Sequence, residues 1–305
     1  MALIYSNNQH YSDIASAIRD KLQSADTFLP SEMAGAIAQI PLGGQDTLKK
    51  VLDITGNGVE LCLGFSDVSF LEKHTTKHAK TLNGAFRGAT ISEIPDIDTT
   101  NCEDFGYMFA ECPNIETASI GADKIGLNSA TSLEAMFALC TSLLSASVTN
   151  IPLSCTTLAD LFDGCTSLGQ IQVSGNTTNI LSTATMFRYC HASTYPLFDT
   201  SSVTNMSGMF AGSAVVTVPA YDCTNVTNFS NIFDSCTLMT SMNMTNIGAN
   251  LDISAGTFSQ SALNTIILNL RQVVLKTLVL GADNMSRLTQ AQITIATDKG
   301  WTLAE

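Results

Sequence analysis

Apolar residues recur at a fixed spacing through the middle of the chain. From position 86 onward a phenylalanine returns after 23, 28, 25, 25, 23, 23 and 25 residues. Most units carry an apolar residue four positions before it and a cysteine three positions after it. These positions lie on one side of a helix, so the pattern predicts a short helix in each unit. We expect the repeat core to consist of Phe86, Phe109, Phe137, Phe162, Phe187, Phe210, Phe233 and Phe258.

A second apolar signal follows each predicted helix. Pairs of alternating apolar residues stand nine and eleven positions after the phenylalanine, as in Ala146 with Val148 and Ile171 with Val173. Alternation with a period of two is typical of a strand. A unit of about 25 residues cannot bury its apolar face alone, so we expect neighbouring units to stack. The predicted fold is an α/β repeat solenoid over residues 81–262.

The chain on either side of the repeats follows other patterns. Residues 1–44 contain two apolar stripes with a spacing of four, which predict two short amphipathic helices. Such small helices bury little surface alone, so we expect them to pack on another chain or, alternatively, to form a lid on the first coil. Their stripes consist of Ile14, Ile18, Leu22, Met33, Ile37 and Ile40.

Both ends of the solenoid are expected to carry atypical capping units. Residues 45–80 are strand-like around the turn Gly56-Asn57-Gly58 and predict an N-terminal cap. Residues 263–305 predict a C-terminal cap of two strands, around positions 263–268 and 278–280, followed by a helix from Thr289 to about Lys299 that ends at Gly300. We expect Trp301, the single tryptophan, to cover the last coil rather than to stack on a ligand.

Composition narrows the classes of partner. The chain carries a net charge of −13 and only 13% charged residues, and no Lys/Arg cluster is present, so we expect no nucleic-acid partner. It contains no apolar run of about 20 residues, which a membrane-spanning helix would need. Residues 1–10 lack the basic start and apolar core of a secretory signal, so we expect neither membrane insertion nor export by that route.

Five of the nine cysteines recur at one position of the unit, three after the phenylalanine, where other units carry Ala89, Ser213 and Ser261. A position that accepts cysteine, alanine or serine requires a small side chain. Buried free thiols pack as compact apolar groups. We therefore favour small buried thiols over a ladder of disulfides.

Candidate chemistry is sparse. His74 and His78 stand four apart, as two metal ligands on a helix would, but Lys73 and Lys77 flank them. Asp96 and Asp98 lack the glycine and the distal glutamate of a calcium loop. Because motifs for acyl transfer, phosphate binding and dithiol redox chemistry are absent, we expect no enzyme, cofactor or metal. Two acids on neighbouring coils would leave no linear signature, so a glycan-degrading enzyme stays an alternative.

The repeat units resemble a known family. Residues 108–115 read Met-Phe-Ala-Glu-Cys-Pro-Asn-Ile, residues 161–168 read Leu-Phe-Asp-Gly-Cys-Thr-Ser-Leu, and residues 202–210 read Ser-Val-Thr-Asn-Met-Ser-Gly-Met-Phe. Together they resemble the BspA-like class of leucine-rich repeats, also catalogued as a Mycoplasma-type surface repeat. The connections of the third and fourth units are longer or shorter than the others, so we expect the curvature of the solenoid to be irregular there.

The two ends resemble a second group of proteins. Residues 11–19, Tyr-Ser-Asp-Ile-Ala-Ser-Ala-Ile-Arg, followed by Leu-Pro-Ser-Glu-Met-Ala at 29–34, resemble the amino-terminal segment of many bacteriophage tail and virion proteins. The stretches 278–289 and 298–303 are similar to the closing segment of phage proteins that carry such repeats.

These resemblances imply a phage virion structural protein, assembled in the host cytoplasm without a signal peptide. Residues 1–44 would dock on other tail, baseplate or capsid subunits, and the solenoid would contact a host-cell receptor as part of a tail fibre or baseplate. We expect the chain to be oligomeric in the particle. The alternatives are a purely architectural baseplate or capsid decoration protein, a glycan-degrading tail enzyme, and a bacterial adhesion protein.

Overall fold

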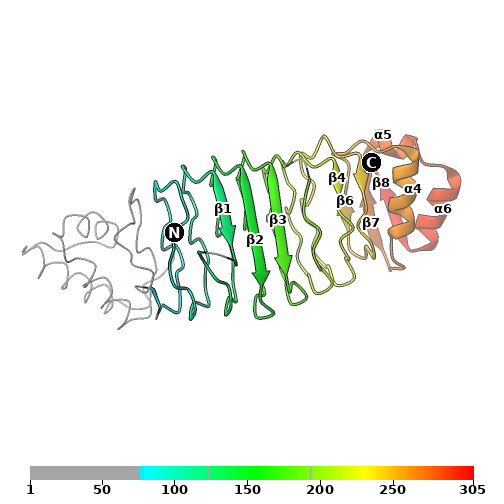
Figure 1. Ribbon diagram of the computed structural model, residues 1–305. Coiled ribbons are helices and arrows are strands. Elements are labelled where there is room, and N and C mark those ends of the chain that lie inside the picture. Colours follow the sequence, from blue (N-terminus) through cyan, green and yellow to red (C-terminus); the bar gives the residue numbers. More distant parts are fainter. Residues whose placement is uncertain (1–75, 78, 123, 193) are drawn as a thin grey trace, which may run out of the picture.

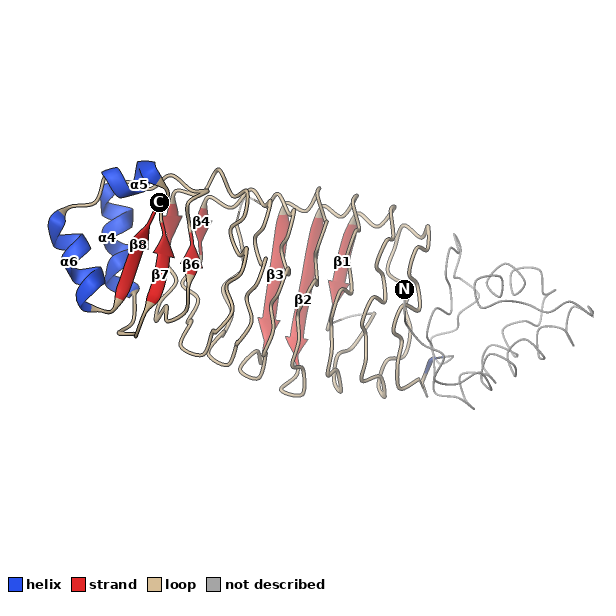
Figure 2. Ribbon diagram, turned by 180° about the vertical axis from the view of Figure 1, so that it is seen from behind, coloured by secondary structure: helices blue, strands red, loops and turns tan. Residues whose placement is uncertain are grey.

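The computed structural model of the chain describes residues 76, 77, 79–122, 124–192 and 194–305. Parallel strands run through this part in three small sheets, and the three described helices lie near the carboxyl-terminal end, where they alternate with the last two strands (Figures 1 and 2). The strands are β1 (Thr117–Ile120), β2 (Ser145–Ile151), β3 (Gln170–Gly175), β4 (Thr217–Val218), β5 (Ser241–Met242), β6 (Leu251–Asp252), β7 (Lys276–Val279) and β8 (Trp301–Ala304). The helices are α4 (Gln260–Asn269), α5 (Ala282–Ser286) and α6 (Gln290–Asp298).

Successive repeat units lie side by side as coils. Each coil is joined to the next by a single-residue parallel bridge at the position five before its phenylalanine. These bridges form one continuous series along the body, which Figure 1 shows as a row of coils of similar width. The series consists of Thr81, Asp104, Ser132, Thr157, Ser182, Asn205 and Asn228.

The strand register follows the repeat. Ala118 of β1 pairs with Ala146 of β2, which pairs with Ile171 of β3. The predicted pairs Ala146 with Val148 and Ile171 with Val173 lie within β2 and β3, so the strand prediction is confirmed there. Val148 and Val173 are buried, because alternate residues of a strand point to opposite faces and this face points into the coils.

The predicted helix in each unit is wrong. Residues 79–122, 124–192 and 194–259 contain no helix, and the segments around each phenylalanine are successive turns. The Phe109 N–H donates to the Met136 carbonyl of the next coil at 2.9 Å, whereas the Ala110 N–H donates to Tyr107 of its own coil at 3.0 Å. Because alternate N–H groups leave the coil in this way, the i to i−4 bonds of an α-helix do not form.

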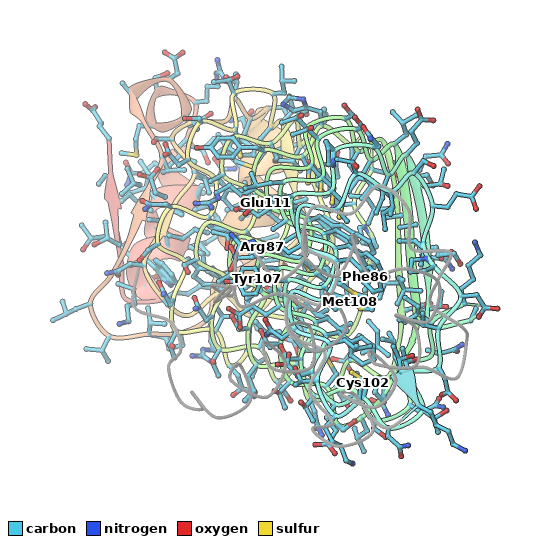
Figure 3. All side chains as sticks on the ribbon, turned by 90° about the vertical axis from the view of Figure 1, so that its left-hand side faces the viewer. Phe86, Arg87, Cys102, Tyr107, Met108 and Glu111 are labelled. Atoms are coloured by element: carbon cyan, nitrogen blue, oxygen red, sulfur yellow. The ribbon has the colours of Figure 1, made fainter. Side chains whose placement is uncertain are left out.

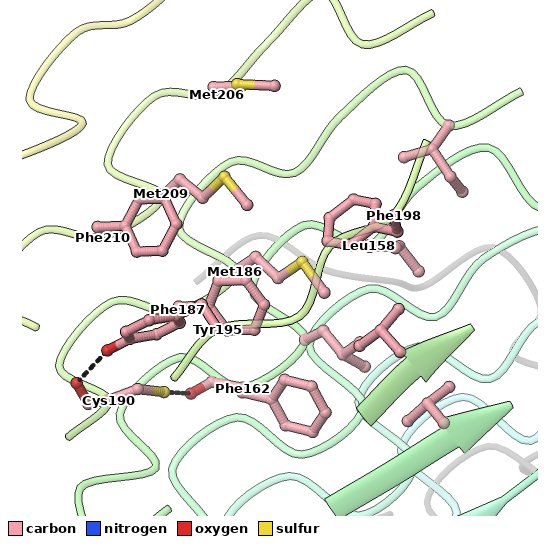
Figure 4. Close-up of a cluster of buried hydrophobic side chains, with 14 of the residues drawn as sticks. Leu158, Phe162, Met186, Phe187, Cys190, Tyr195, Phe198, Met206, Met209 and Phe210 are labelled. Carbon is pink, nitrogen blue, oxygen red and sulfur yellow. Dashed lines mark hydrogen bonds between the residues drawn. The ribbon is translucent and has the colours of Figure 1, made fainter. Parts of the chain in front are cut away.

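The phenylalanines nevertheless lie one above another inside the coils. All eight are buried, and the first seven, from Phe86 to Phe233, form six consecutive stacked pairs. Ring centroids are 5.2 Å apart between Phe86 and Phe109 and 6.2 Å apart between Phe162 and Phe187. Figure 4 shows three of these rings, with Tyr195 meeting Phe187 and Phe210 edge-on. Offset stacks of this kind add to the stabilisation from burial.

The eight cysteines that the structure describes are all free and buried. The prediction of small buried thiols is therefore confirmed for the five repeated cysteines among them. Cys112, Cys140, Cys165, Cys190 and Cys236 each donate an S–H bond of 3.0 to 3.1 Å to the phenylalanine carbonyl of the preceding coil. One such contact, between Cys190 and Phe162, is drawn in Figure 4. The thiol therefore fills a small space and also binds one coil to the next.

The C-terminal cap is partly as predicted. The strand predicted around Leu263 is wrong, because this segment is the helix α4. Ser259 caps the helix, and its buried residues Leu263, Ile266 and Ile267 follow the helical period. The strand prediction at 278–280 is confirmed by β7 through Val279. The closing helix is confirmed as α6, whose Thr289 forms a capping box with Gln292.

Trp301 closes the last sheet. Its indole is buried and donates to the Arg271 carbonyl at 2.9 Å, and β8 extends the sheet beyond β7. The residue directly before it, Gly300, has φ +84, and a Cβ there would lie 2.1 Å from the Val273 carbonyl oxygen. Only glycine fits this turn between α6 and β8.

Candidate functional site

The turn segments form a surface on the opposite side of the coils from the strands. We call it the turn face and define it as the residues from five before to two after each of the first seven repeated phenylalanines, Phe86 to Phe233. Figure 3, viewed along the coils from the end at residue 76, shows Arg87, Tyr107 and Glu111 on this side. Phe86 and Met108 point instead into the coils.

Left-handed backbone recurs on the turn face. In each of the first seven coils the residues two before and two after the phenylalanine have a positive φ. Glycine adopts this conformation at little cost, whereas other residues lose about 1 to 2 kcal/mol. The left-handed residues are Gly84, Gly88, Tyr107, Glu111, Ala135, Leu139, Asp160, Gly164, Thr185, Tyr189, Gly208, Gly212, Asn231 and Ser235.

Two of these residues are large, apolar and exposed. Leu139 is 50% exposed and Tyr189 is 53% exposed, so about half of each residue's surface is open to a partner. Each lies over a glycine of the next coil, because a Cβ on Gly164 would stand 2.6 Å from Leu139 Cδ2 and one on Gly212 would stand 2.4 Å from Tyr189 Cδ1. The coils thus present a leucine and a tyrosine where the backbone favours glycine.

An arginine and an aromatic ring lie together at the start of the face. Arg87 Nη2 lies 2.6 Å from Glu111 Oε1, and the Arg87 Cζ is 5.8 Å from the centre of the Tyr107 ring. The ring packs against three buried alanines, Ala110, Ala135 and Ala138. Small residues of its own coil and of the next coil therefore hold the Tyr107 ring against the surface.

A similar combination recurs at Arg188, four coils after Arg87. Arg188 makes two hydrogen bonds to Asp163, at 2.7 and 2.5 Å, and its Cζ lies 5.7 Å from the centre of the Tyr189 ring. The hydrogen bonds to Asp163 raise the pKa of the Arg188 guanidinium, so this group stays charged. Asp163 is mostly buried, which favours the pairing over full hydration.

Carboxylates occupy the middle of the face between the two arginines. Partial burial, and then the charges of Asp160 and Asp104, raise the pKa of Glu134. Burial, and then Glu134 and Asp160, raise the pKa of the Tyr107 phenol. Asp160 accepts a hydrogen bond from Thr185, and no described Lys or Arg forms an ion pair with Glu134 or Asp160. The face is therefore acidic at its centre.

Most other polar side chains of the coils serve the backbone. Thr131, Thr156, Thr204 and Thr227 each donate to a carbonyl of the preceding coil. Asn and Ser residues five before the phenylalanine accept an N–H two residues later, as Asn205 does from Ser207. Such contacts replace the hydrogen bonds that a helix or a wide sheet would make. The arginines, tyrosines and central carboxylates of the turn face are not used in this way.

The residues that the sequence singled out are placed as follows. The eight phenylalanines lie in the core, and the stripe from Ile14 to Ile40, together with His74 and His78, lies outside the described residues. Asp98 accepts from Thr100, and the described residues hold no group of three potential metal ligands. Sequence reasoning missed Tyr107 and Tyr189, although the alternation of glycine with large residues two positions from the phenylalanine was a usable signal.

Three further findings concern membrane-spanning helices and the similarity of the chain to known proteins. In the part that the structure describes, no helix has the length and apolar character to cross a membrane. Comparison with curated proteins finds no match. A model of the family described as "Mycoplasma protein of unknown function, DUF285" matches residues 65–151 and 156–266, which covers most of the coils. The chain belongs to this DUF285 family.

Proposed function

We propose that the chain is a phage virion structural protein, a tail fibre or baseplate component that attaches the particle to the host surface through its turn face. Residues 1–44 dock it on other virion subunits. The resemblance of both ends to phage virion segments supports the virion part of this proposal. The resemblance of the coils to BspA-like leucine-rich repeats supports an elongated solenoid that presents one long face.

One observation carries the attachment part. Leu139 and Tyr189 stand at backbone positions that favour glycine, and about half of the surface of each is exposed. Exposed large residues in a strained backbone conformation are a reason to look for function. Tyrosine and arginine are also enriched where proteins bind one another, and Arg188 lies beside Tyr189.

The first experiment tests attachment with whole host cells. Labelled full-length protein should bind them saturably, and the double variant Leu139→Gly/Tyr189→Gly should bind at least about tenfold more weakly, because two central apolar contacts are lost. The matched control is Leu153→Gly, since Leu153 is 51% exposed but lies off the turn face. Saturable binding that the double variant retains would contradict the role of the turn face.

The purely architectural alternative has a distinct outcome. In that case particles would contain the protein, yet the purified full-length chain would show no saturable binding to host cells. Binding in the first experiment excludes this alternative.

A second experiment tests docking. A chain that lacks residues 1–44 should stay folded but be absent from assembled particles, because the stripes with Ile14 and Ile37 would be missing. Particle content is measured by mass spectrometry of purified virions, with full-length protein as the control. Normal incorporation of the truncated chain would refute the docking role.

A further inference from the structure

The end of the molecule farthest from residue 76 carries a groove between two helices. Figures 1 and 2 show α4 and α6 side by side beyond the last strands. The groove is a shallow, open depression with a volume of about 440 Å³. Gln260, Ser261 and Asn264 line it from α4, and Thr289, Ala291 and Ile295 line it from α6 and its cap.

The two walls are held in place by one buried side chain. Gln292 is 4% exposed and its amide nitrogen donates to the Gln260 carbonyl at the start of α4. Its amide oxygen accepts from the Thr289 N–H and hydroxyl at the start of α6. Because every polar atom of this amide contacts a wall of the groove, the helix starts are fixed relative to each other before any ligand arrives.

The polar side chains that line the groove from α4 are exposed to solvent and available to a ligand. Gln260, Ser261 and Asn264 make no side-chain hydrogen bond to another described residue, whereas most threonines and asparagines of the coils bond to a neighbouring backbone. Gln260 and Asn264 are one helical turn apart, so their amides lie on the same side of α4. Together they offer donors and acceptors in one place.

We propose that this groove binds a neutral saccharide. Its lining contains no charged residue, and amides and hydroxyls match sugar hydroxyls, which both donate and accept. Ala291 and Ile295 add an apolar surface for the C–H face of a sugar ring. The helix starts would by themselves favour an anion, but the lining supplies no Lys or Arg and the chain as a whole carries −13.

The proposal deepens the attachment function and rests on it for the source of the sugar, a glycan of the host surface. Binding of a free sugar to the groove does not depend on virion assembly or on the turn face. Failure of one proposal therefore leaves a different result from failure of the other.

The experiment is a titration of the isotope-labelled full-length chain with methyl α-glucoside, methyl α-galactoside and methyl α-mannoside, followed by NMR. At least one glycoside should shift the amide resonances of α4 and α6 saturably, with a Kd of about 1 mM, which is usual for one small ligand in an open site. Glucuronate serves as the charged comparison. Absence of shifts with all three glycosides, or tighter binding of glucuronate, would overturn the proposal.

Two variants locate the effect. Gln260→Ala/Asn264→Ala removes two exposed amides and should weaken binding about tenfold or more while the chain stays folded. Gln290→Ala is the matched control, because Gln290 is also the first residue of a helix but does not line the groove. Equal affinity in the double variant and the wild type would assign the shifts to another site and contradict the inference.

Discussion

The coils and the C-terminal cap satisfy their backbones in opposite ways. In the coils, alternate N–H groups around each phenylalanine bond to the next coil, as Phe109 does to Met136. In the cap, α4 and α6 close their own hydrogen bonds and use side-chain caps at Ser259 and Thr289. A coil therefore depends on its neighbour, whereas the cap can end the series. Because the helices of the cap satisfy their own backbone, the polar side chains on the surface of α4 are not needed for backbone hydrogen bonds, whereas most polar side chains of the coils are.

The largest expected difference between the two regions is in how much stability each loses at alkaline pH. Burial raises the pKa of Cys112 to about 12 and that of Cys155 to about 11, and it raises the pKa of Cys165 and Cys190 as well. Thiols of the unfolded chain ionise near pH ~8.5, so from that pH up to the folded-state pKa of each thiol only the unfolded state loses these protons. The free energy of unfolding should then fall by about 1.4 kcal/mol per pH unit for each buried thiol.

Urea unfolding between pH 8 and 11 measures this slope. Because residues 260–305 contain no cysteine, the loss belongs to the coils. A variant with Cys140→Ala, Cys165→Ala and Cys190→Ala should have a slope that is shallower by about 4 kcal/mol per pH unit. An unchanged slope would show that the thiols do not control alkaline stability.

Next in size is the loss of one ring from the phenylalanine column. Phe137 is stacked on both sides, by Phe109 and Phe162, and is fully buried. Phe137→Ala should lower the free energy of unfolding by about 3 to 5 kcal/mol through lost burial and a cavity. The exposed Leu153→Ala serves as control and should change it by less than about 0.5 kcal/mol. A loss below about 1 kcal/mol at Phe137 would contradict a continuous core.

The junction between the two regions gives a smaller effect. Asn284 is buried, donates to the carbonyls of Gly256 and Leu280, and accepts from the Phe258 N–H. Asn284→Leu leaves these three backbone groups unpaired and should cost about 2 to 3 kcal/mol. Hydrogen exchange should show that the cap opens before the coils. Uniform loss of protection along the chain would instead show that cap and coils unfold as one unit.

The smallest effect sharpens the account of the coils. Thr204 donates its hydroxyl to the Leu181 carbonyl, and Leu181 itself stands where Thr156 and Thr204 stand in their coils. Thr204→Val should destabilise the fold by about 0.5 to 1 kcal/mol, because one hydrogen bond is lost. Leu181→Thr should stabilise the fold by a similar amount, because it adds such a hydrogen bond in another coil. Thermal unfolding of both variants measures it. A more stable Thr204→Val variant and a less stable Leu181→Thr variant would show that the residues six before the phenylalanine contribute by packing instead.

The sequence predicted the period, the buried phenylalanines, the strand pairs and the closing helix, because these depend on side-chain polarity alone. It did not distinguish coils from helices, since positions −4, 0 and +3 also face inward in a chain of turns. The glycines at 84, 88, 208 and 212 were the missed sign, because helix interiors disfavour glycine. Around Leu263, by contrast, a true helix was taken for a strand because its run of apolar residues is short.

The turn face and the groove were beyond sequence reasoning for a physical reason. Arg87 reaches Glu111, and Arg188 reaches Asp163, across about 25 positions of sequence, so only the stacking of coils brings them together. Likewise, Gln260 and Gln292 meet only because two helices start side by side.

The central claim is that the turn face keeps Leu139 and Tyr189 for binding rather than for stability. The most direct test measures urea unfolding and host-cell binding on the same preparation of Leu139→Gly/Tyr189→Gly. Relief of the left-handed strain should offset both the lost half-burial of the two side chains and the extra freedom of glycine in the unfolded chain, so stability should stay within about 1 kcal/mol of the wild type. Binding should fall at least about tenfold. Loss of more than about 2 kcal/mol of stability with unchanged binding would show that these side chains serve the fold, and would contradict the claim.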